Sequence, residues 1–353
     1  MKQILLINDG GSANLGDKAI KNTLESLLRD ANCDVDWVSF SGWVGKNRSQ
    51  AARPEAKPAW WKKLARKILP AELRWLLKNG RMFLRHLRTS KYDLILIGGG
   101  QLIQSNSVFG LAMFIWVFLF KKFHKKKVIL IAVGATERYS RLDRYLFGKS
   151  LKLVDGVYVR DSNSLSALKN IFGVSAGVVP DFAFCINRIY EYPPQKEKRA
   201  MFCPVSYEFY KRKNDRPDAE LSYDEYLQYW IESILEYWND NYEVKLFCMS
   251  MSTDLAIAKI LKQILFDEHE VDIEILDIWT LGELTKEIAK SEVVVGARMH
   301  ALIIGCAYGC KVIPYRTSEK IQAFKEEYVN SSIRLDKVQS RIIGAVEKIV
   351  GDA

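Results

Sequence analysis

The sequence predicts an α/β protein built from two doubly wound parallel sheets. Short runs of β-branched and apolar residues alternate with longer segments of helical periodicity along almost the whole chain, as is typical of strands joined by helices. The length of 353 residues exceeds the usual size of one domain, so two are expected. Hydrophobic residues make up 48% of the chain, which suffices for two cores and excludes a disordered protein.

The first domain is expected over residues 1–186. Its strands are predicted by short apolar runs, and its helices by apolar residues that recur at helical spacing. In chain order, the expected strands are 4–7, 35–40, 94–97, 128–133, 157–159 and 177–179. The expected helices are 17–28, 108–120, 141–153 and 162–171.

A second domain is expected over residues 200–335, after a linker at 187–199 where a pair of prolines and a charge cluster interrupt the pattern. Its expected strands are 200–205, 244–248, 271–275, 293–295 and 311–313, and its expected helices are 223–238, 255–265, 281–289 and 299–308. An amphipathic stretch within 336–353 predicts a C-terminal helix that crosses back to the first domain. Two Rossmann-like domains facing a cleft are the architecture of GT-B glycosyltransferases and their relatives.

Cysteine and histidine usage argues against a metal centre. The six cysteines lie mostly in apolar runs without a C-x-x-C pair, and the four histidines are scattered. This pattern predicts buried thiols in a reducing compartment. The longest apolar run, 108–120, is shorter than the ~20 residues that span a bilayer, and the first apolar run is too short for a signal peptide. We therefore expect a cytoplasmic protein.

Residues 57–91 carry the whole charge imbalance of the chain. The formal net charge is +10, and this stretch holds eleven Lys or Arg against one acid, Glu72. Its apolar residues recur at helical spacing, with interruptions at Pro70 and Gly80. Cations and tryptophans on amphipathic helices favour an anionic membrane surface. The alternatives are an ordinary solvated face and nucleic acid, although no recognised nucleic-acid motif accompanies the segment and no such partner is expected.

The stretch "VVVGARMHALIIGCAYG", residues 293–309, predicts an anion-binding site. Three valines form a buried strand, Gly296 ends it, and an apolar helix follows. Arg298 and His300 therefore lie where a strand gives way to a helix, which in open α/β sheets is the ligand-binding edge. A surface arginine beside a core histidine is the alternative interpretation.

Other segments place glycines or charges at predicted strand and helix ends. "NDGGSANLGDKAI", residues 8–20, is not a G-x-G-x-x-G motif, so nicotinamide binding is not expected. "LILIGGGQLIQSN", residues 94–106, places three glycines where the backbone approaches a ligand or another segment closely. "VYVRD" places Arg160 at a strand end. Lys320 lies in a first helical turn, against the preference of the helix dipole, and an anionic ligand would explain it.

Together these stretches resemble the polysaccharide pyruvyl transferase family. "NLGDKAI", "DLILIGGGQLIQ", "VYVRDSNS", "VVPDFAF" and "VVVGARMHALIIG" occur in the family's order, and the last is the most specific. The resemblance implies a GT-B fold and transfer of a pyruvyl group from phosphoenolpyruvate to a sugar as a cyclic ketal. It implies catalytic roles for Arg160, Arg298 and His300, and donor contacts from these residues together with Met299 and Lys320. Candidate acceptor-binding residues are Asn14, Asp17, Gly99, Gly100 and Gln101.

The implied chemistry suits these residue types and requires no metal or cofactor. Arginine binds phosphate and carboxylate well, and Arg160 and Arg298 from opposite domains would clamp the donor. An imidazole is suited to proton transfer near neutral pH, but His300 could protonate the enol carbon, accept the hydroxyl proton or only bind phosphate. The expected partners are phosphoenolpyruvate, a sugar acceptor on a lipid-linked precursor, and an anionic membrane surface bound by residues 57–91.

Two other functions remain open from the sequence. A glycosyltransferase using a nucleotide sugar would employ Glu319 and Glu327, whose spacing is that of retaining enzymes of this architecture. A non-catalytic protein of the same fold would bind an anion or a glycan without turnover.

Overall fold

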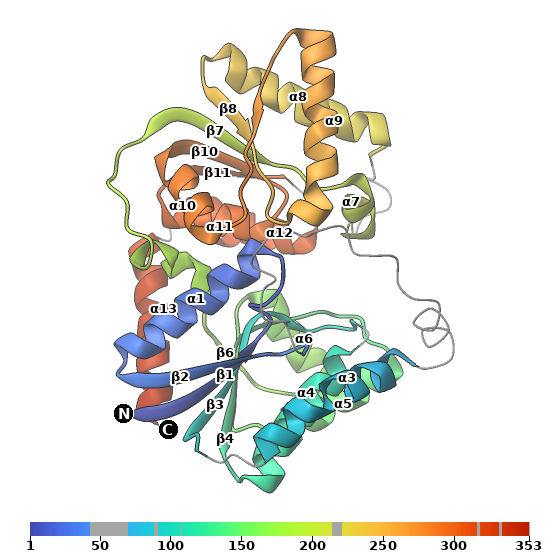
Figure 1. Ribbon diagram of the computed structural model, residues 1–353, viewed down its shortest axis with the longest axis vertical. Helices are drawn as coiled ribbons and strands as arrows, with labels where there is room; N and C mark the ends of the chain where they lie inside the picture. Colours follow the sequence, from blue (N-terminus) through green and yellow to red (C-terminus); the bar gives the residue numbers. More distant parts are fainter. Residues whose placement is uncertain are drawn as a thin grey trace. The chain divides into compact units, whose positions relative to one another are not determined.

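The computed structural model describes residues 1–42, 70–87, 91–106, 108–213, 221–315, 318–331 and 334–352. The chain divides into two compact units (Figure 1). Unit 1 comprises Met1–Ser12, Ile20–Phe182 and Ser340–Ala353. Unit 2 comprises Ala13–Ala19 and Ala183–Gln339.

Unit 1 contains a parallel sheet whose described strands have the order β2-β1-β3-β4-β5-β6. The strands are β1 (Lys2–Asn8), β2 (Cys33–Ser39), β3 (Leu94–Ile103), β4 (Lys127–Ala135), β5 (Gly156–Val159) and β6 (Gly177–Val178). The helices are α1 (Leu15–Asp30), which starts in unit 2, α3 (Ala71–Leu87), α4 (Phe109–Phe118), the π-helix η1 (Leu119–Phe123), α5 (Arg141–Leu151), α6 (Ser162–Phe172) and the end of α13 (Leu335–Gly351).

Both faces of this sheet are covered by helices, as the continuous apolar strands require. Leu5, Ile7, Ile95 and Ile97 share one buried cluster with Trp116 of α4. Figure 1 shows α3, α4 and α5 on one side of the sheet and α1 with α13 on the other.

The strand β3 continues through the triple glycine, whereas the sequence predicted that the strand ends at residue 97. A Cβ atom at Gly98 would lie 1.9 Å from the carbonyl oxygen of Ile131 in β4. A Cβ atom at Gly99, where φ is +73°, would lie 2.1 Å from Cγ2 of Ile20 on α1. The glycines are therefore required where neighbouring segments of the same unit approach this strand.

Unit 2 contains a second parallel sheet, in the order β11-β10-β7-β8-β9 among the described residues. Its strands are β7 (Glu197–Cys203), β8 (Glu243–Leu246), β9 (Glu274–Ile275), β10 (Ser291–Gly296) and β11 (Lys311–Pro314). Its described helices are the 3₁₀-helix η2 (Phe182–Arg188), which begins in unit 1, α7 (Tyr207–Lys213), α8 (Tyr223–Asn239), α9 (Met251–His269), α10 (Leu281–Lys290), α11 (Met299–Ala307), α12 (Glu319–Phe324), the π-helix η4 (Lys325–Val329) and the start of α13. The predicted class, two doubly wound α/β sheets, is confirmed.

The division of the chain differs from the boundaries drawn on the sequence. Unit 2 starts at Ala183, and β7 starts at Glu197 inside the range 187–199 that was expected to be a linker. Unit 2 also includes Ala13–Ala19, where the N–H of Leu15 donates to the carbonyl oxygen of Met249 at 2.9 Å. The pattern of apolar residues along the sequence cannot predict this hydrogen bond.

The described residues can be compared with what the composition predicted for thiols, membrane-spanning helices and metal ligands. All six thiols are free, and all but Cys306 are buried. Within the described ranges, no helix is both long enough and apolar enough to cross a bilayer. No group of three or more potential metal ligands occurs in the same ranges. Of the basic segment 57–91, residues 57–69 and 88–90 lie outside the described residues.

Candidate active site

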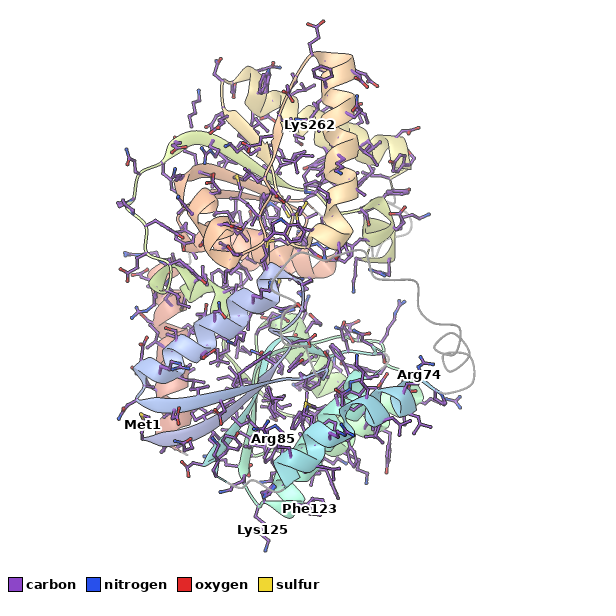
Figure 2. All side chains as sticks on the ribbon, in the orientation of Figure 1. Met1, Arg74, Arg85, Phe123, Lys125 and Lys262 are labelled. Carbon is purple, nitrogen blue, oxygen red and sulfur yellow. The ribbon has the colours of Figure 1, made fainter. Side chains whose placement is uncertain are left out.

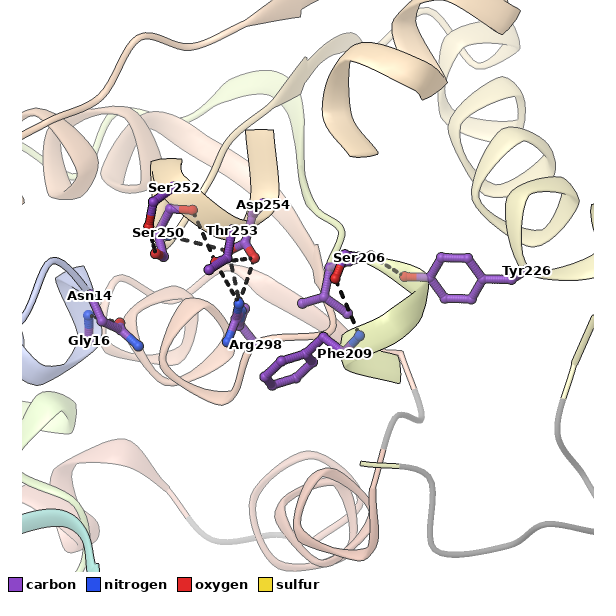
Figure 3. Close-up of polar contacts among 11 residues, drawn as sticks. Asn14, Gly16, Ser206, Phe209, Tyr226, Ser250, Ser252, Thr253, Asp254 and Arg298 are labelled. Atoms are coloured by element: carbon purple, nitrogen blue, oxygen red, sulfur yellow. Dashed lines mark hydrogen bonds and ion pairs between the residues drawn. The ribbon is translucent and has the colours of Figure 1, made fainter. Parts of the chain in front are cut away.

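The candidate site lies at the edge of the unit 2 sheet where its parallel strands end. Strands β10, β7 and β8 are neighbours in this sheet. Arg298 follows β10, Phe209 lies in the helix after β7, and Asp254 lies in the helix after β8. Since the carboxyl ends of parallel strands meet at one edge, the fold brings these three side chains together (Figure 3).

Arg298 is held along one edge of its guanidinium by Asp254. Nε donates to Oδ2 at 3.2 Å, and Nη2 donates to Oδ1 at 2.5 Å and to Oγ1 of Thr253 at 3.1 Å. The Asp254 side chain is fully buried, whereas that of Arg298 is 14% exposed. Two parallel charge-assisted bonds fix the plane of the guanidinium. Among the described residues, Nη1 makes no hydrogen bond.

Phe209 fixes the same guanidinium from one face. Cζ of Arg298 lies 4.1 Å from the centroid of the Phe209 ring, within the range of cation–π contacts. Cζ of Arg212, on the same helix as Phe209, lies 5.5 Å from that centroid. Oγ of Ser206 accepts the N–H of Phe209 at 3.2 Å at the start of α7 (Figure 3). Arg298 is therefore positioned from two directions before any ligand binds.

The first amides of α11 lie immediately beside this arginine. Arg298 is the residue before the helix, with extended backbone angles of φ −107° and ψ 121°, and its side chain does not cap the helix. Met299 and His300 supply the first two N–H groups of α11. The first amides of a helix have no carbonyl partner within it and favour an anion. A phosphate or carboxylate at this point would meet these amides and the outer edge of Arg298.

His300 lies against the start of α1, which belongs to the same unit. A Cβ atom built at Gly16 would lie 2.3 Å from Nδ1 and 2.5 Å from Cγ of His300. Asn14 caps α1, because its Oδ1 accepts the N–H of Gly16 at 2.8 Å. The segment "NLGDKAI" therefore does more than begin a helix: its glycine makes room for the imidazole.

Substituting Gly16 by alanine is expected to lower turnover about a hundredfold while the fold is retained. The added methyl group overlaps the ring of His300 and displaces it, and a misplacement of about 1 Å can cost on the order of 10²-fold in rate. Gly344→Ala is the matched control, because a Cβ atom at Gly344, also in a helix, meets no atom within 4 Å. Steady-state kinetics and circular dichroism of both variants test this; an active Gly16→Ala protein would contradict it.

Two buried thiols, of Cys203 and Cys248, lie at this edge. Burial raises the pKa of the Cys203 thiol well above its usual range, and the carboxylate of Asp254 raises it further. Burial raises the pKa of Cys248 to about 12. Both thiols therefore stay protonated at neutral pH, and a protonated thiol is a poor nucleophile.

Arg160 lies in unit 1, where protein groups surround its guanidinium. Nε donates to Asp161 at 3.3 Å, Nη1 to Asp181 at 3.3 Å and Nη2 to Oε1 of Gln101 at 2.5 Å. The side chain is 2% exposed. A Cβ atom at Gly134 would lie 2.9 Å from Nη2, so this glycine makes room for the arginine. The charge of Arg160 is thus balanced inside unit 1, and its predicted contact with a donor remains a prediction.

The structure distributes the residues singled out from the sequence over both units. Within unit 2 it brings together Arg298, Met299 and His300 and adds the start of α1, which carries Asn14 and Asp17. Lys320 lies in the first turn of α12 of the same unit. Gly99, Gly100 and Gln101 belong to β3 of unit 1, and Gln101 is one of the hydrogen-bond partners of Arg160 in that unit.

Sequence reasoning missed Asp254, Thr253, Phe209 and the role of Gly16. The signal for Asp254 was available, because "SMSTD" follows an apolar strand and its polar residues are typical of a helix start. The sequence-based helix nevertheless began only at residue 255, whereas α9 begins at Met251. No sequence pattern indicates that Phe209 packs on an arginine 89 residues later.

Known structures share this fold at low sequence identity. UDP-GlcNAc 2-epimerase from Methanocaldococcus jannaschii is 12% identical with a TM-score of 0.54, covering 98% of this chain and 92% of that one. UDP-GlcNAc 2-epimerase from Neisseria meningitidis, bound to UDP-GlcNAc, is 11% identical with a TM-score of 0.52, covering 100% and 99%. These similarities show the GT-B-like fold alone. No curated protein matches the chain.

The structural comparisons show only the fold, whereas the comparison with family models identifies a family. The polysaccharide pyruvyl transferase model matches residues 14–319, a span that contains Gly16, Arg160, Asp254, Arg298 and His300. The chain belongs to the polysaccharide pyruvyl transferase family.

Proposed function

We propose that the protein transfers the pyruvyl group of phosphoenolpyruvate to two hydroxyls of a sugar, forming a cyclic ketal and releasing phosphate. The observation that carries the proposal is the cluster at the start of α11. There an arginine fixed by Asp254 and Phe209 adjoins the first helical amides and His300. This combination offers both anion recognition and proton transfer.

The donor carries a phosphate and a carboxylate, and the site favours such an anion. Asp254 balances much of the charge of Arg298. We therefore propose that the donor anion is bound by the outer edge of the guanidinium and by the amides of Met299 and His300. We assign further donor contacts to Arg160 and Lys320, as the family resemblance implies.

The reaction needs proton movement at three points. A proton adds to the methylene carbon of phosphoenolpyruvate, and one sugar hydroxyl bonds to the neighbouring carbon and loses its proton. The bond from that carbon to the phosphate oxygen then breaks, and a second hydroxyl bonds to the carbon and loses its proton. We assign His300 to proton transfer, because an imidazole can gain and lose a proton near neutral pH.

We propose that the acceptor is a sugar of a surface polysaccharide, presented as a lipid-linked precursor at the inner face of the membrane. In this proposal Asn14, Asp17, Gly99, Gly100 and Gln101 contact the acceptor. The protein would then be cytoplasmic and peripherally bound to the membrane.

Phosphate release is expected only when phosphoenolpyruvate and a suitable glycan are both present. The purified protein is incubated with phosphoenolpyruvate and a panel of candidate glycans, and released phosphate and the mass of the glycan are measured. A ketal adds a defined mass to the glycan, which distinguishes transfer from simple hydrolysis. Tight binding of a nucleoside diphosphate without any response to phosphoenolpyruvate would contradict the proposal.

A further inference from the structure

Helix α3 of unit 1 has two apolar faces. Trp75, Asn79 and Phe83 are buried, and the rings of Trp75 and Phe83 lie 5.4 Å apart. On the solvent side, a stripe of leucines stays exposed: Leu73 by 41%, Leu76 by 38%, Leu77 by 69% and Leu84 by 56%. At about 100° per residue, these four positions and Gly80 fall within an arc of roughly 100°. Packing against the described residues does not explain four exposed leucines on one arc.

Cations line one side of this stripe. Lys78, Arg81 and Arg85 are exposed and lie on the helix between the leucine arc and the buried arc. Glu72 is the one acid in the helix. Burial lowers the pKa of His86, and the neighbouring Arg85 lowers it further, so His86 is neutral at pH 7 and belongs to the buried side.

A second basic and apolar segment lies at the end of α3, contributed by η1. The ring of His86 lies 5.5 Å from that of Trp116 in α4, and Nε2 of His124, just after η1, lies 3.0 Å from the carbonyl oxygen of His86. In this segment, "LFKKFHKKK", Phe123 is 64% exposed. Lys122 and Lys125 are also exposed. Figure 2 shows Phe123 and Lys125 at the tip of this end of unit 1, with Arg74 and Arg85 along α3.

We propose that this α3–η1 face docks on an anionic lipid surface. The face consists of the exposed residues Leu73, Leu76, Leu77, Leu84, Phe123, Lys78, Arg81, Arg85, Lys122 and Lys125. An anionic bilayer suits both features, because its headgroups attract cations and its headgroup–acyl boundary accepts leucine and phenylalanine side chains. The excess of one sign of charge favours this occupant over a protein surface of mixed charge. Two segments that are separate in the sequence thus contribute to one surface.

This inference deepens the proposed membrane location but does not depend on the proposed reaction. The docking residues belong to unit 1, and the candidate active-site cluster at Arg298 and His300 belongs to unit 2. Vesicle binding without turnover would leave docking intact and contradict only the reaction. Turnover on a water-soluble glycan without vesicle binding would support the reaction and contradict only the docking.

Gly80 provides the decisive test because it lies within the leucine stripe and a Cβ atom there meets nothing within 4 Å. Gly80→Leu is expected to increase binding to vesicles of phosphatidylcholine and phosphatidylglycerol about fivefold or more, since a further apolar side chain enters the interface. Gly80→Glu is expected to reduce binding about fivefold, since each charge near such a surface counts by roughly that factor. Both replacements favour the helix over glycine, so a loss of fold does not explain the contrast.

Gly344→Leu is the matched control. It adds the same side chain at an exposed helical glycine with open space, on α13, and is expected to leave vesicle binding unchanged. Co-sedimentation with vesicles, with and without phosphatidylglycerol and at low and high salt, measures the effect. Wild-type protein that ignores anionic vesicles at low salt would overturn the proposal. So would equal binding of the two Gly80 variants, or a self-association that Gly80→Glu abolishes in the absence of lipid.

Discussion

Arg298→Ala is expected to lower the free energy of unfolding by about 3–5 kcal/mol, a large part of the stability of a typical domain. The loss of stability comes from Asp254, which remains buried after its partner Arg298 has been removed. Asp254 is fully buried and its two carboxylate oxygens accept from the guanidinium, so the variant leaves a buried charge without its counter-ion. Denaturation by urea measures the effect. Adding Asp254→Asn to the same protein removes the residual charge and is expected to recover a large part of the loss.

The matched control for this prediction is Arg334→Ala. Arg334 also forms an ion pair, with Asp336 at 3.1 Å, but the two side chains are 74% and 61% exposed. Exposed pairs contribute about 0–1 kcal/mol, so this change is expected to leave stability almost unaltered. Arg298→Lys is not expected to restore activity, because an ammonium group cannot satisfy both oxygens of Asp254 and still present a planar edge to a ligand. Equal stability losses in Arg298→Ala and Arg334→Ala would show that the buried pair does not act as described.

His300→Ala is expected to reduce turnover by about 10²–10⁴-fold, the contribution typical of a positioned acid or base. The imidazole lies at the start of α11 next to Arg298 and against Gly16, and no other histidine belongs to this cluster of described residues. Phosphate release from phosphoenolpyruvate in the presence of an accepted glycan measures the effect. The substitution removes a ring without adding bulk, so the fold is expected to survive.

His269→Ala is the control for that experiment. This histidine is exposed at the last turn of α9 in the same unit and is expected to be dispensable. Comparable circular dichroism of both variants separates a chemical defect from a folding defect. Near-normal phosphate release by a well-folded His300→Ala protein would remove the histidine from the mechanism.

The sequence predicted the alternation of strands and helices well because the central strands of both sheets are buried on both faces. Runs such as Val293–Val295 and Leu94–Ile97 are apolar without alternation, which is typical of parallel sheets covered by helices. The strand β3 was predicted too short because three glycines normally end a strand, whereas here close neighbours require them inside one. The helix α7 was missed because "YEFYKRK" shows no clear helical stripe; Tyr210 is buried against Tyr226 and Tyr315, which are distant in sequence.

Arg298 and His300 of the candidate site could be predicted from the sequence, but the residues that contact Arg298 could not. Arg298 and His300 follow from a strand end next to a helix start, which is a local feature. The partners of Arg298 follow from the order of strands in the sheet, since β10 pairs with β7, which in turn pairs with β8, although all three are far apart in the sequence. The burial of Arg160 among Asp161, Asp181 and Gln101 also depends on three separate segments, and local patterns cannot predict such a neighbourhood.

The two units interleave along the chain, and this affects how the protein can be made. Residues Ala13–Ala19 leave the ribosome before nearly all of unit 1 but belong to unit 2, and Ser340–Ala353 leave it after unit 2 but belong to unit 1. A fragment of residues 183–339 would therefore lack Gly16, and unit 1 lacks the end of α13 until unit 2 has been translated. Domains that are continuous in sequence can fold one after the other during synthesis. Here completion of each unit requires translation of the other, so the two must mature together.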